Sequence, residues 1–324
     1  MESRREFLKT AATGALLLGT TSAVGLAAAT GKSRVVVARD PKVFSSPGQL
    51  DEARVQALLD LAIHRYTGIE DPAEAWRRIV PVGKTIGLKV NGLGGKGIAT
   101  HTALTHAVCE RLQQAGVKPQ NIVIWEQRTD FLRACGYEHS EDPTRIRTIS
   151  SEKFGYEQTP VSYGGVQVKL ARALTLCDMV IGLPILKDHS MAGLTFAMKN
   201  MYGVVERPQD LHASGCNPAV ADLNCIPEIC HKVRFTIGDA LSSVYDGGPS
   251  FHPERLWYPN ALIVGEDRVA IDHTALQMLE RKRAEAGVKA LEEAGRPARY
   301  IATAADATHQ LGTNDPQNIH LIEV

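Results

Sequence analysis

Three side chains capable of acid–base chemistry stand together in the middle of the sequence. Lys187, Asp188 and His189 follow the apolar residues 179–183, which predict a buried strand ending at Pro184. In open α/β sheets, residues just beyond the carboxyl ends of strands line the ligand crevice. We therefore predict catalytic roles for Lys187, as a positive charge, and for His189, as a group that exchanges a proton near neutral pH. An ordinary solvated turn is the alternative.

A second polar segment follows another predicted strand, residues 85–91. The glycine-rich residues 92–97 come directly after it, and a helix capped by Thr100 or Thr102 follows. A strand, a glycine loop and a helix start together favour anion binding through free backbone N–H groups, although the spacing matches neither a dinucleotide fingerprint nor a Walker A motif, and a flexible turn is the alternative. The residues predicted to bind a cofactor or anion are Lys89, Asn91, Gly94, Gly95, Lys96 and, from the later segment, Lys199 and Asn200.

Acidic residues stand at the ends of further predicted strands. Glu126 ends the strand of residues 121–126, and Asp239, the third predicted catalytic residue, ends the strand of residues 233–239. Asp246 lies in a second glycine loop and, with His189, is a candidate ligand of a divalent cation. Parallel strands point the same way, so we expect one shared cavity, bounded by Lys89, Asn91, Glu126, Lys187, His189 and Asp239.

The elements that would position these residues predict an α/β fold. Helical periodicity over residues 50–66 and 267–281 alternates with short apolar strands, which indicates a mostly parallel, Rossmann-like central sheet with helices on both faces and room for two lobes. We also expect a short helix over residues 195–202, a peripheral excursion over 131–162, and an edge strand over 320–324.

The N-terminus resembles an export signal. Residues 3–9 read SRREFLK, a twin-arginine signature, and a weakly apolar stretch leads to three alanines at 27–29. We expect residues 1–29 to be a signal peptide, residues 30–324 to form one α/β domain, and the twin-arginine translocase to export the folded chain to the periplasm. A transmembrane anchor is the alternative, but glycine and threonine interrupt the apolar run, and we expect no span in the mature chain.

Charge and cysteine usage exclude several partners. Lys plus Arg and Asp plus Glu both number 36, so the chain offers no basis for nucleic-acid binding. Six cysteines occur without any C-x-x-C pair, so no complete self-contained iron–sulfur motif is present. Cys216, Cys225 and Cys230 form a cluster that is compatible with a disulfide, with small buried residues or with a metal site.

Motifs spread over nearly the whole mature chain resemble the DUF362 family of uncharacterised proteins. The matching segments are LKVN (88–91), PILKDH (184–189), KNMYG (199–203), DLN (222–224), GDA (238–240), GGP (247–249) and VGEDRVAID (264–272). Many members of that family carry or neighbour ferredoxin-type modules, which this sequence lacks, and this argues against a redox role. Residues 102–125 also resemble the N-terminal region of nickel-pincer lactate racemases, without a motif that places that family's lysine or metal ligands.

Two functions fit these residues, with a purely structural scaffold as a third reading. One is an enzyme of redox or isomerase type that binds a cofactor, a metal ion or a small anionic ligand in the crevice, with Lys187 and Lys199 as the positive clamp. The other is a non-catalytic periplasmic protein that delivers a metal or ligand to a partner. The identity of the cofactor stays open at this point.

Overall fold

The computed structural model describes residues 31–324. The predicted signal peptide lies outside these residues. Among the described helices, none is both long enough and apolar enough to cross a bilayer.

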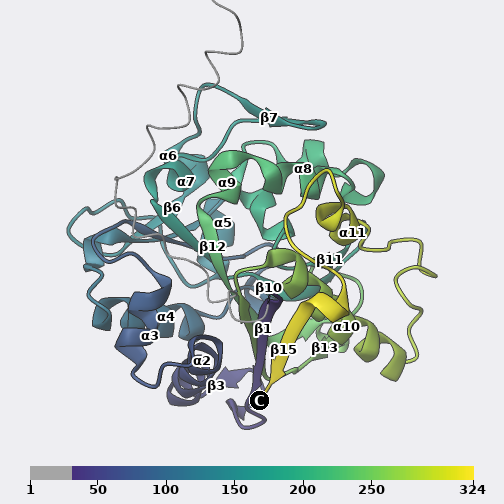
Figure 1. Cartoon of the computed structure of the whole chain (residues 1–324), viewed down its shortest axis with the longest axis horizontal. Coiled ribbons are helices and arrows are strands. Elements are labelled where there is room, and N and C mark those ends of the chain that lie inside the picture. Colours follow the sequence, from purple (N-terminus) through teal and green to yellow (C-terminus); the bar gives the residue numbers. More distant parts are fainter. Residues whose placement is uncertain (1–30) are drawn as a thin grey trace, which may run out of the picture.

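A mixed, mostly parallel sheet of eleven strands forms the centre of the molecule (Figure 1). Its main path runs β15-β1-β14-β12-β9-β4-β5-β6, and only β14 runs antiparallel to both of its neighbours on this path. The predicted fold class is therefore confirmed. The strands of this path are β1 (Ser33–Arg39), β4 (Ile86–Lys89), β5 (Ile122–Glu126), β6 (Arg147–Ser150), β9 (Met179–Gly182), β12 (Val233–Val244), β14 (Ala261–Gly265) and β15 (Ile319–Glu323).

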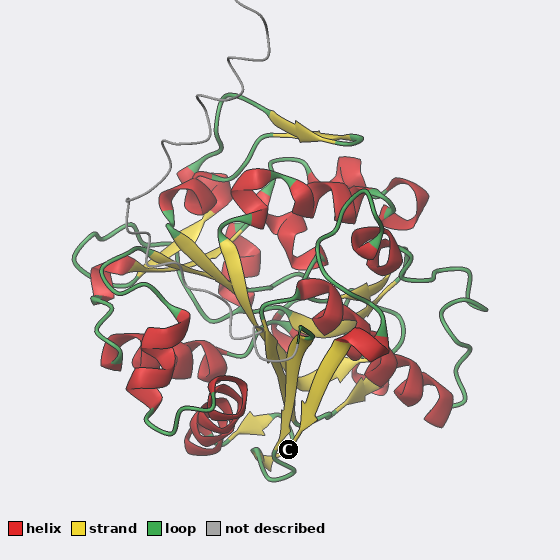
Figure 2. Cartoon of the chain, in the orientation of Figure 1, coloured by secondary structure: helices red, strands yellow, loops and turns green. Residues whose placement is uncertain are grey.

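Five of the helices form two layers, one on each face of the sheet (Figure 2). One layer contains α2 (Glu52–Thr67), α3 (Pro72–Ile79) and α4 (Thr102–Gln114); the other includes α8 (Ala219–Cys225) and α10 (Arg268–Glu285). Side chains alternate between the two faces along each strand, so Val35 of β1 packs into one core and Val36 into the other. The shorter helices are α5 (Thr129–Ala134), α6 (Ser151–Phe154), α7 (Arg172–Leu176), α9 (Pro227–Cys230) and α11 (Tyr300–Ala305).

Local sequence signals set the helix ends. The carboxylate of Asp51 accepts a hydrogen bond from the backbone N–H of Arg54 at the start of α2, and Gly68 ends that helix with a φ of 75°. Asp71 caps α3 in the same way, followed by Pro72 at its first position. These signals explain why both helices form close to where the sequence predicts them.

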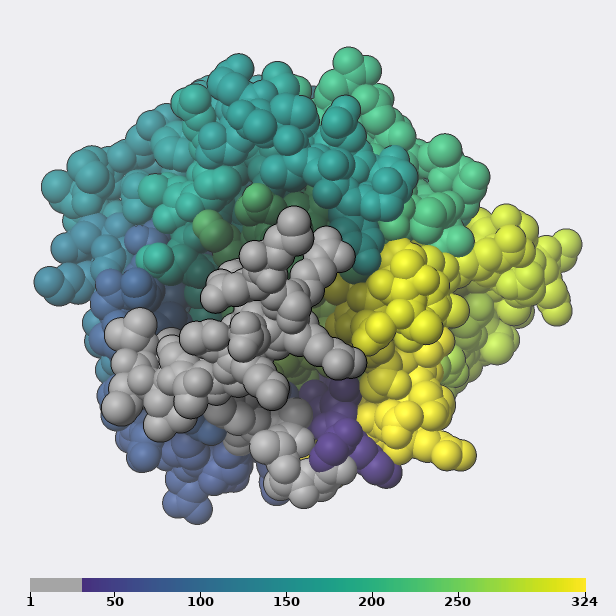
Figure 3. All heavy atoms as spheres, turned by 45° about the horizontal axis from the view of Figure 1, so that its top comes forward, coloured from purple at the N-terminus to yellow at the C-terminus, as the bar shows by residue number. Residues whose placement is uncertain are grey.

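The ends of the described chain meet at one edge of the sheet. β15 pairs in parallel with β1 and forms the outermost strand at this edge. Figure 3 shows the yellow C-terminal atoms beside the purple ones of residues near 31. The predicted C-terminal edge strand is confirmed.

Two local predictions are wrong. Lys187, Asp188 and His189 do not form a loop after a strand: they belong to β10 (Ile185–His189), which pairs with β11 (Gly193–Thr195) and with β12. The helix expected over 195–202 is absent from that part of the described chain, where β11 is followed by a 3-10 segment at Lys199–Val204.

The region expected to be peripheral, residues 131–162, contributes β6 to the sheet edge. Five further short strands complete the architecture. β13 (Leu256–Trp257) pairs with β12, and two hairpins lie apart from the sheet: β2 (Phe44–Ser46) with β3 (Gln49–Leu50), and β7 (Val161–Tyr163) with β8 (Val166–Val168).

Candidate functional site

A cavity of about 740 Å³ lies where the carboxyl ends of β4 and β5 meet the β10–β11 hairpin and the 3-10 segment that follows it. Ligands of open α/β sheets bind at this edge. The predicted site residues that line it are Lys89, Asn91, Glu126, His189, Lys199 and Asn200.

Lys199 is the cation of this cavity that lacks a carboxylate partner. Its Nζ atom lies 3.4 Å from Nε2 of His212 and 3.9 Å from the ring centroid of Tyr202. Cys216 is a further neighbour, and it acts to raise the pKa of Lys199. Among the ion pairs of residues 31–324, none joins Lys199 to a carboxylate. Burial lowers the pKa of Lys199 to about 8, so its amine exists in both protonation states near neutral pH.

His212 has a defined tautomer. Its Nδ1 lies 2.9 Å from the carbonyl oxygen of Pro208, so Nδ1 carries the proton and donates it to that oxygen. Nε2 is then left as an acceptor facing Lys199. Burial and the charge of Lys199 both lower the pKa of His212, which keeps this ring neutral.

His189 is a neutral wall of the cavity rather than the proton exchanger that we predicted. Its Nδ1 accepts hydrogen bonds from the backbone N–H groups of Met191 (3.1 Å) and Ala192 (3.2 Å). Burial, reinforced by the charges of Lys199 and other cations, lowers its pKa to about 2. The ring therefore presents an Nε2–H donor and stacks on His212, with the centroids 5.8 Å apart.

Lys89 and Glu126 form a buried ion pair in the cavity wall. The Lys89 amine also donates to the carbonyl of Val90 at 2.6 Å. Gly203 lies against this pair, and a Cβ atom there would sit 2.8 Å from the Lys89 amine and 3.3 Å from Glu126. The glycine of the KNMYG segment is thus explained by close approach rather than by backbone conformation.

Lys187 has no exposed surface, and its side chain holds the glycine loop in place through hydrogen bonds to loop carbonyls. Its Nζ donates to Oδ1 of Asn91 (2.9 Å), to the carbonyl of Leu93 and to the carbonyl of Ile98 (3.3 Å). Asn91 in turn donates to Oδ1 of Asn200 at 3.1 Å. Lys187 therefore reaches the cavity through Asn91 and Leu93, which both line it, and its predicted direct catalytic contact is corrected to a positioning role.

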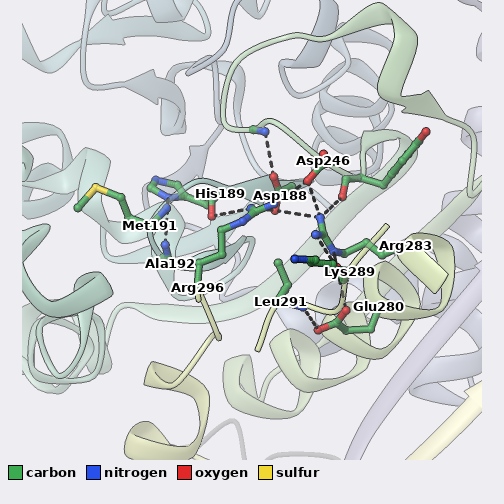
Figure 4. A network of polar contacts seen from close by, with 12 residues as sticks. Asp188, His189, Met191, Ala192, Asp246, Glu280, Arg283, Lys289, Leu291 and Arg296 are labelled. Carbon is green, nitrogen blue, oxygen red and sulfur yellow. Dashed lines mark hydrogen bonds and ion pairs between the residues drawn. The ribbon is translucent and has the colours of Figure 1, made fainter. Parts of the chain in front are cut away.

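Asp188 and Asp246 belong to a separate charge network (Figure 4). Arg296 binds both carboxylates, at 2.6 Å for Asp246, and Arg283 binds Asp246 at 2.9 Å. Burial alone would raise the pKa of Asp246, but the two arginines lower it. Arg296 also donates to the backbone carbonyl of His189 at 3.2 Å, which ties the network to the cavity wall. The carboxylate of Asp246 thus pairs with two arginines, and it is not free to bind the divalent metal ion that we predicted.

The expectation that Asp239 lines the same cavity is corrected. Its Oδ2 accepts from the backbone N–H and Nδ1 of His101, both at 2.8 Å. β12 does not end at Asp239 but continues to Val244. The predicted contacts Gly94, Gly95 and Lys96 are not lining residues of this cavity either; Lys96 lines a different one.

Within residues 31–324, no group of three or more His, Cys, Asp or Glu side chains is placed to hold a metal ion. All six cysteines are free thiols. The open question about Cys216, Cys225 and Cys230 is therefore answered against a disulfide in this structure.

Two cavity residues had no signal in the sequence. His212 follows Lys199 by thirteen positions in an irregular segment, so no periodicity relates them. Thr195 has a buried hydroxyl without a hydrogen-bond partner, and it faces the cavity from β11. Either residue could have been found only from the spatial arrangement of β10, β11 and the segment after them.

Two solved structures are similar to this chain at low sequence identity. A protein from Thermotoga maritima is 13% identical, with a TM-score of 0.44 over 72% of this chain and 59% of that one. The lactate racemase apoprotein from Thermoanaerobacterium thermosaccharolyticum is 12% identical, with a TM-score of 0.35 over 64% of this chain and 52% of that one. This chain therefore covers less than two thirds of the length of each of these two proteins, and no curated protein matches.

The domain of unknown function DUF362 matches residues 86–277, more than half of the sequence, and the chain therefore belongs to the DUF362 family.

Proposed function

We propose that this chain is an exported periplasmic protein that binds a small anionic molecule, or the anionic part of a cofactor, in the cavity around Lys199. The observation that carries the proposal is the buried Lys199 amine without a carboxylate partner. A buried charge is costly unless it is paired, so an incoming anion gains the attraction without first breaking an ion pair. Export rests on the twin-arginine signature of residues 3–9.

The surrounding groups suit a carboxylate ligand. The orphaned hydroxyl of Thr195 and the Nε2–H of His189 offer two further hydrogen bonds. Aromatic and apolar cavity residues, Tyr202 and Met191 among them, leave room for a short carbon chain.

The proposed reaction is of isomerase type. An amine with a pKa of about 8 can take a proton from a carbon next to a carboxylate and return it, because both of its protonation states are populated near neutral pH. In this reading the neutral form of Lys199 takes the proton, while the Thr195 hydroxyl and the Nε2–H of His189 hold the carboxylate. The ammonium so formed pairs with the negative charge that develops on the ligand until the proton is returned, and His212 accepts a hydrogen bond from the Lys199 amine and holds it in place.

Protein recovered after native export provides the test. Thermal-shift screening against pyruvate, malate and citrate should reveal binding. Proton NMR of malate or citrate in deuterated buffer should show exchange at a carbon beside a carboxylate. Metal analysis and an absorption spectrum of the same sample detect a co-purified cofactor. Binding without exchange would assign the chain to the non-catalytic delivery role, and no binding of any carboxylate would overturn the proposal.

A further inference from the structure

A second cavity, of about 410 Å³, lies on a different part of the molecule, at the start of α4. It shares no lining residue with the cavity around Lys199. Three polar residues that the proposed function does not use, Asp239, His101 and Ser242, meet beside it.

The three residues are arranged as a nucleophile (Ser242), a base (His101) and an acid that orients the base (Asp239). Nδ1 of His101 lies 2.8 Å from Oδ2 of Asp239, and Nε2 of the same ring lies 3.2 Å from Oγ of Ser242. A carboxylate can only accept, so Nδ1 carries the proton, and Nε2 is left to accept from the serine hydroxyl. These are the contacts through which a histidine activates a serine.

An irregularity of β12 makes this arrangement possible. Asp239 and Ser242 are three residues apart, so in a regular strand they would point to opposite faces. The pairing of β12 with β10 joins Ile185 to Asp239 but Lys187 to Val244, so extra residues are accommodated between them. Such a bulge redirects a side chain and is frequent beside active sites. It brings both Asp239 and Ser242 to the same histidine.

We propose that Ser242, His101 and Asp239 form a second active site, which hydrolyses carboxylic esters. The Ser242 oxygen forms a bond to the acyl carbon, His101 takes the serine proton at Nε2, and the same proton is given to the departing alcohol as the ester bond breaks. Water then attacks the acyl-serine and gives a proton to Nε2. Nε2 passes this proton to the Ser242 oxygen as the acyl–oxygen bond breaks, which releases the acid and restores the serine. Asp239 accepts the hydrogen bond from Nδ1 and holds the tautomer of His101.

The walls of this cavity define the class of ester. Phe44, Phe251, Tyr258 and Leu256 give this cavity an apolar side, and Lys96 and Arg133 also line it. A small apolar acyl group fits against the aromatic side chains. Thr102 begins α4 at the same cavity, and the His101 side chain makes no capping bond to the first turn of that helix. N–H groups of that turn can therefore face the negative oxygen of the reacting carbonyl.

Labelling by a fluorophosphonate tests the site in the full chain. A reactive serine forms an oxygen–phosphorus bond and displaces fluoride, so mass spectrometry should find the label on Ser242. Hydrolysis of p-nitrophenyl butyrate should fall at least ~100-fold in Ser242→Ala, since loss of a triad nucleophile costs several orders of magnitude. His101→Gln should lose both labelling and hydrolysis.

Ser243→Ala is the matched control, because Ser243 is the next residue of β12 and its buried hydroxyl makes no bond within the described chain. Labelling and hydrolysis should be unchanged in this variant. Melting temperatures of all variants separate a loss of chemistry from a loss of folding. An unlabelled wild-type chain that does not hydrolyse the ester, or equal labelling of wild type and Ser242→Ala, would show that the three residues only hold the start of α4 on β12.

Discussion

The amine of Lys199 and Nε2 of His212 lie 3.4 Å apart in a cavity where no described carboxylate pairs with the lysine. This relationship distinguishes Lys199 from Lys89, whose charge is already matched by Glu126. An anion entering the cavity therefore meets a cation that is free to pair with it, and the remaining lysines of the region serve to shape the walls.

The first prediction concerns the pH dependence of ligand binding. Burial lowers the pKa of Lys199 to about 8, so its positive charge is lost as the pH rises through that value. Citrate is fully ionised above neutral pH, so its own charge does not change there. We expect citrate to bind progressively more weakly above pH 8, as measured by calorimetry. Affinity that stays constant up to pH 10 would show that Lys199 does not hold the anion.

A second prediction separates positioning from catalysis at Lys187. Lys187→Met leaves Oδ1 of Asn91 and the carbonyls of Leu93 and Ile98 without their donor. Each unsatisfied buried acceptor costs about 1–3 kcal/mol, so with three acceptors we expect the free energy of unfolding to fall by at least about 3 kcal/mol in urea denaturation. If the variant keeps its stability but no longer binds the ligand, Lys187 contacts the ligand directly, as the sequence predicted.

The stability lost in Lys187→Met should also depend on pH. Burial lowers the pKa of Lys187 to about 7 from 10.5, so between these values the unfolded state binds more protons and the stability contributed by this group increases with pH. The difference between wild type and variant should therefore grow from about pH 6 to about pH 9. A difference that shrinks over this range would contradict the assignment.

The third prediction concerns the arginine network beneath the cavity wall. Arg296→Met leaves the buried carboxylate of Asp188 with one guanidinium fewer and removes the bond to the His189 carbonyl. Breaking a buried pair costs about 3–5 kcal/mol. The exposed pair of Arg299 with Glu292 supplies the control, since Arg299→Met should cost at most about 1 kcal/mol. If thermal denaturation shows that both variants lose a similar amount of stability, the buried network around Arg296 does not stabilise the protein more than an exposed ion pair does.

A fourth prediction tests the close approach at Gly203. Gly203→Ala places a methyl group within 2.8 Å of the Lys89 amine, so the ion pair with Glu126 must shift. Overpacking of this kind costs about 1–3 kcal/mol. Gly165→Ala is the control, because the Cβ there meets only Asp222 at an ordinary 3.6 Å. Equal stability of the two variants would mean that the ion pair tolerates displacement.

Much of the fold could be predicted because local patterns determine it. The apolar run of β5 reads directly as a buried strand, and Asp51 and Asp71 mark helix starts by capping. β10 was missed because Lys187, Asp188 and His189 are polar, and polar runs indicate loops. Their burial depends on partners distant in sequence, such as Asn91 and Arg296.

The candidate site was predictable only in part for the same reason. The rule that strand ends share an edge correctly placed Lys89, Asn91 and Glu126 around one cavity. It failed for Asp239, because β12 continues past this residue and its carboxylate turns to His101. Strand length and side-chain direction depend on pairing with β10 and β14, which the sequence alone does not specify.

Calorimetric titration of pyruvate, malate and citrate into wild type and Lys199→Met tests the central claim most directly. Removing the unpaired amine should weaken the best of these ligands at least ~10-fold, since a hydrogen bond to a charged group contributes about 1.5–3 kcal/mol. Lys153→Met, at an exposed position on α6, serves as the control and should bind as wild type does. Equal affinity of wild type and Lys199→Met for every carboxylate that binds would contradict the account.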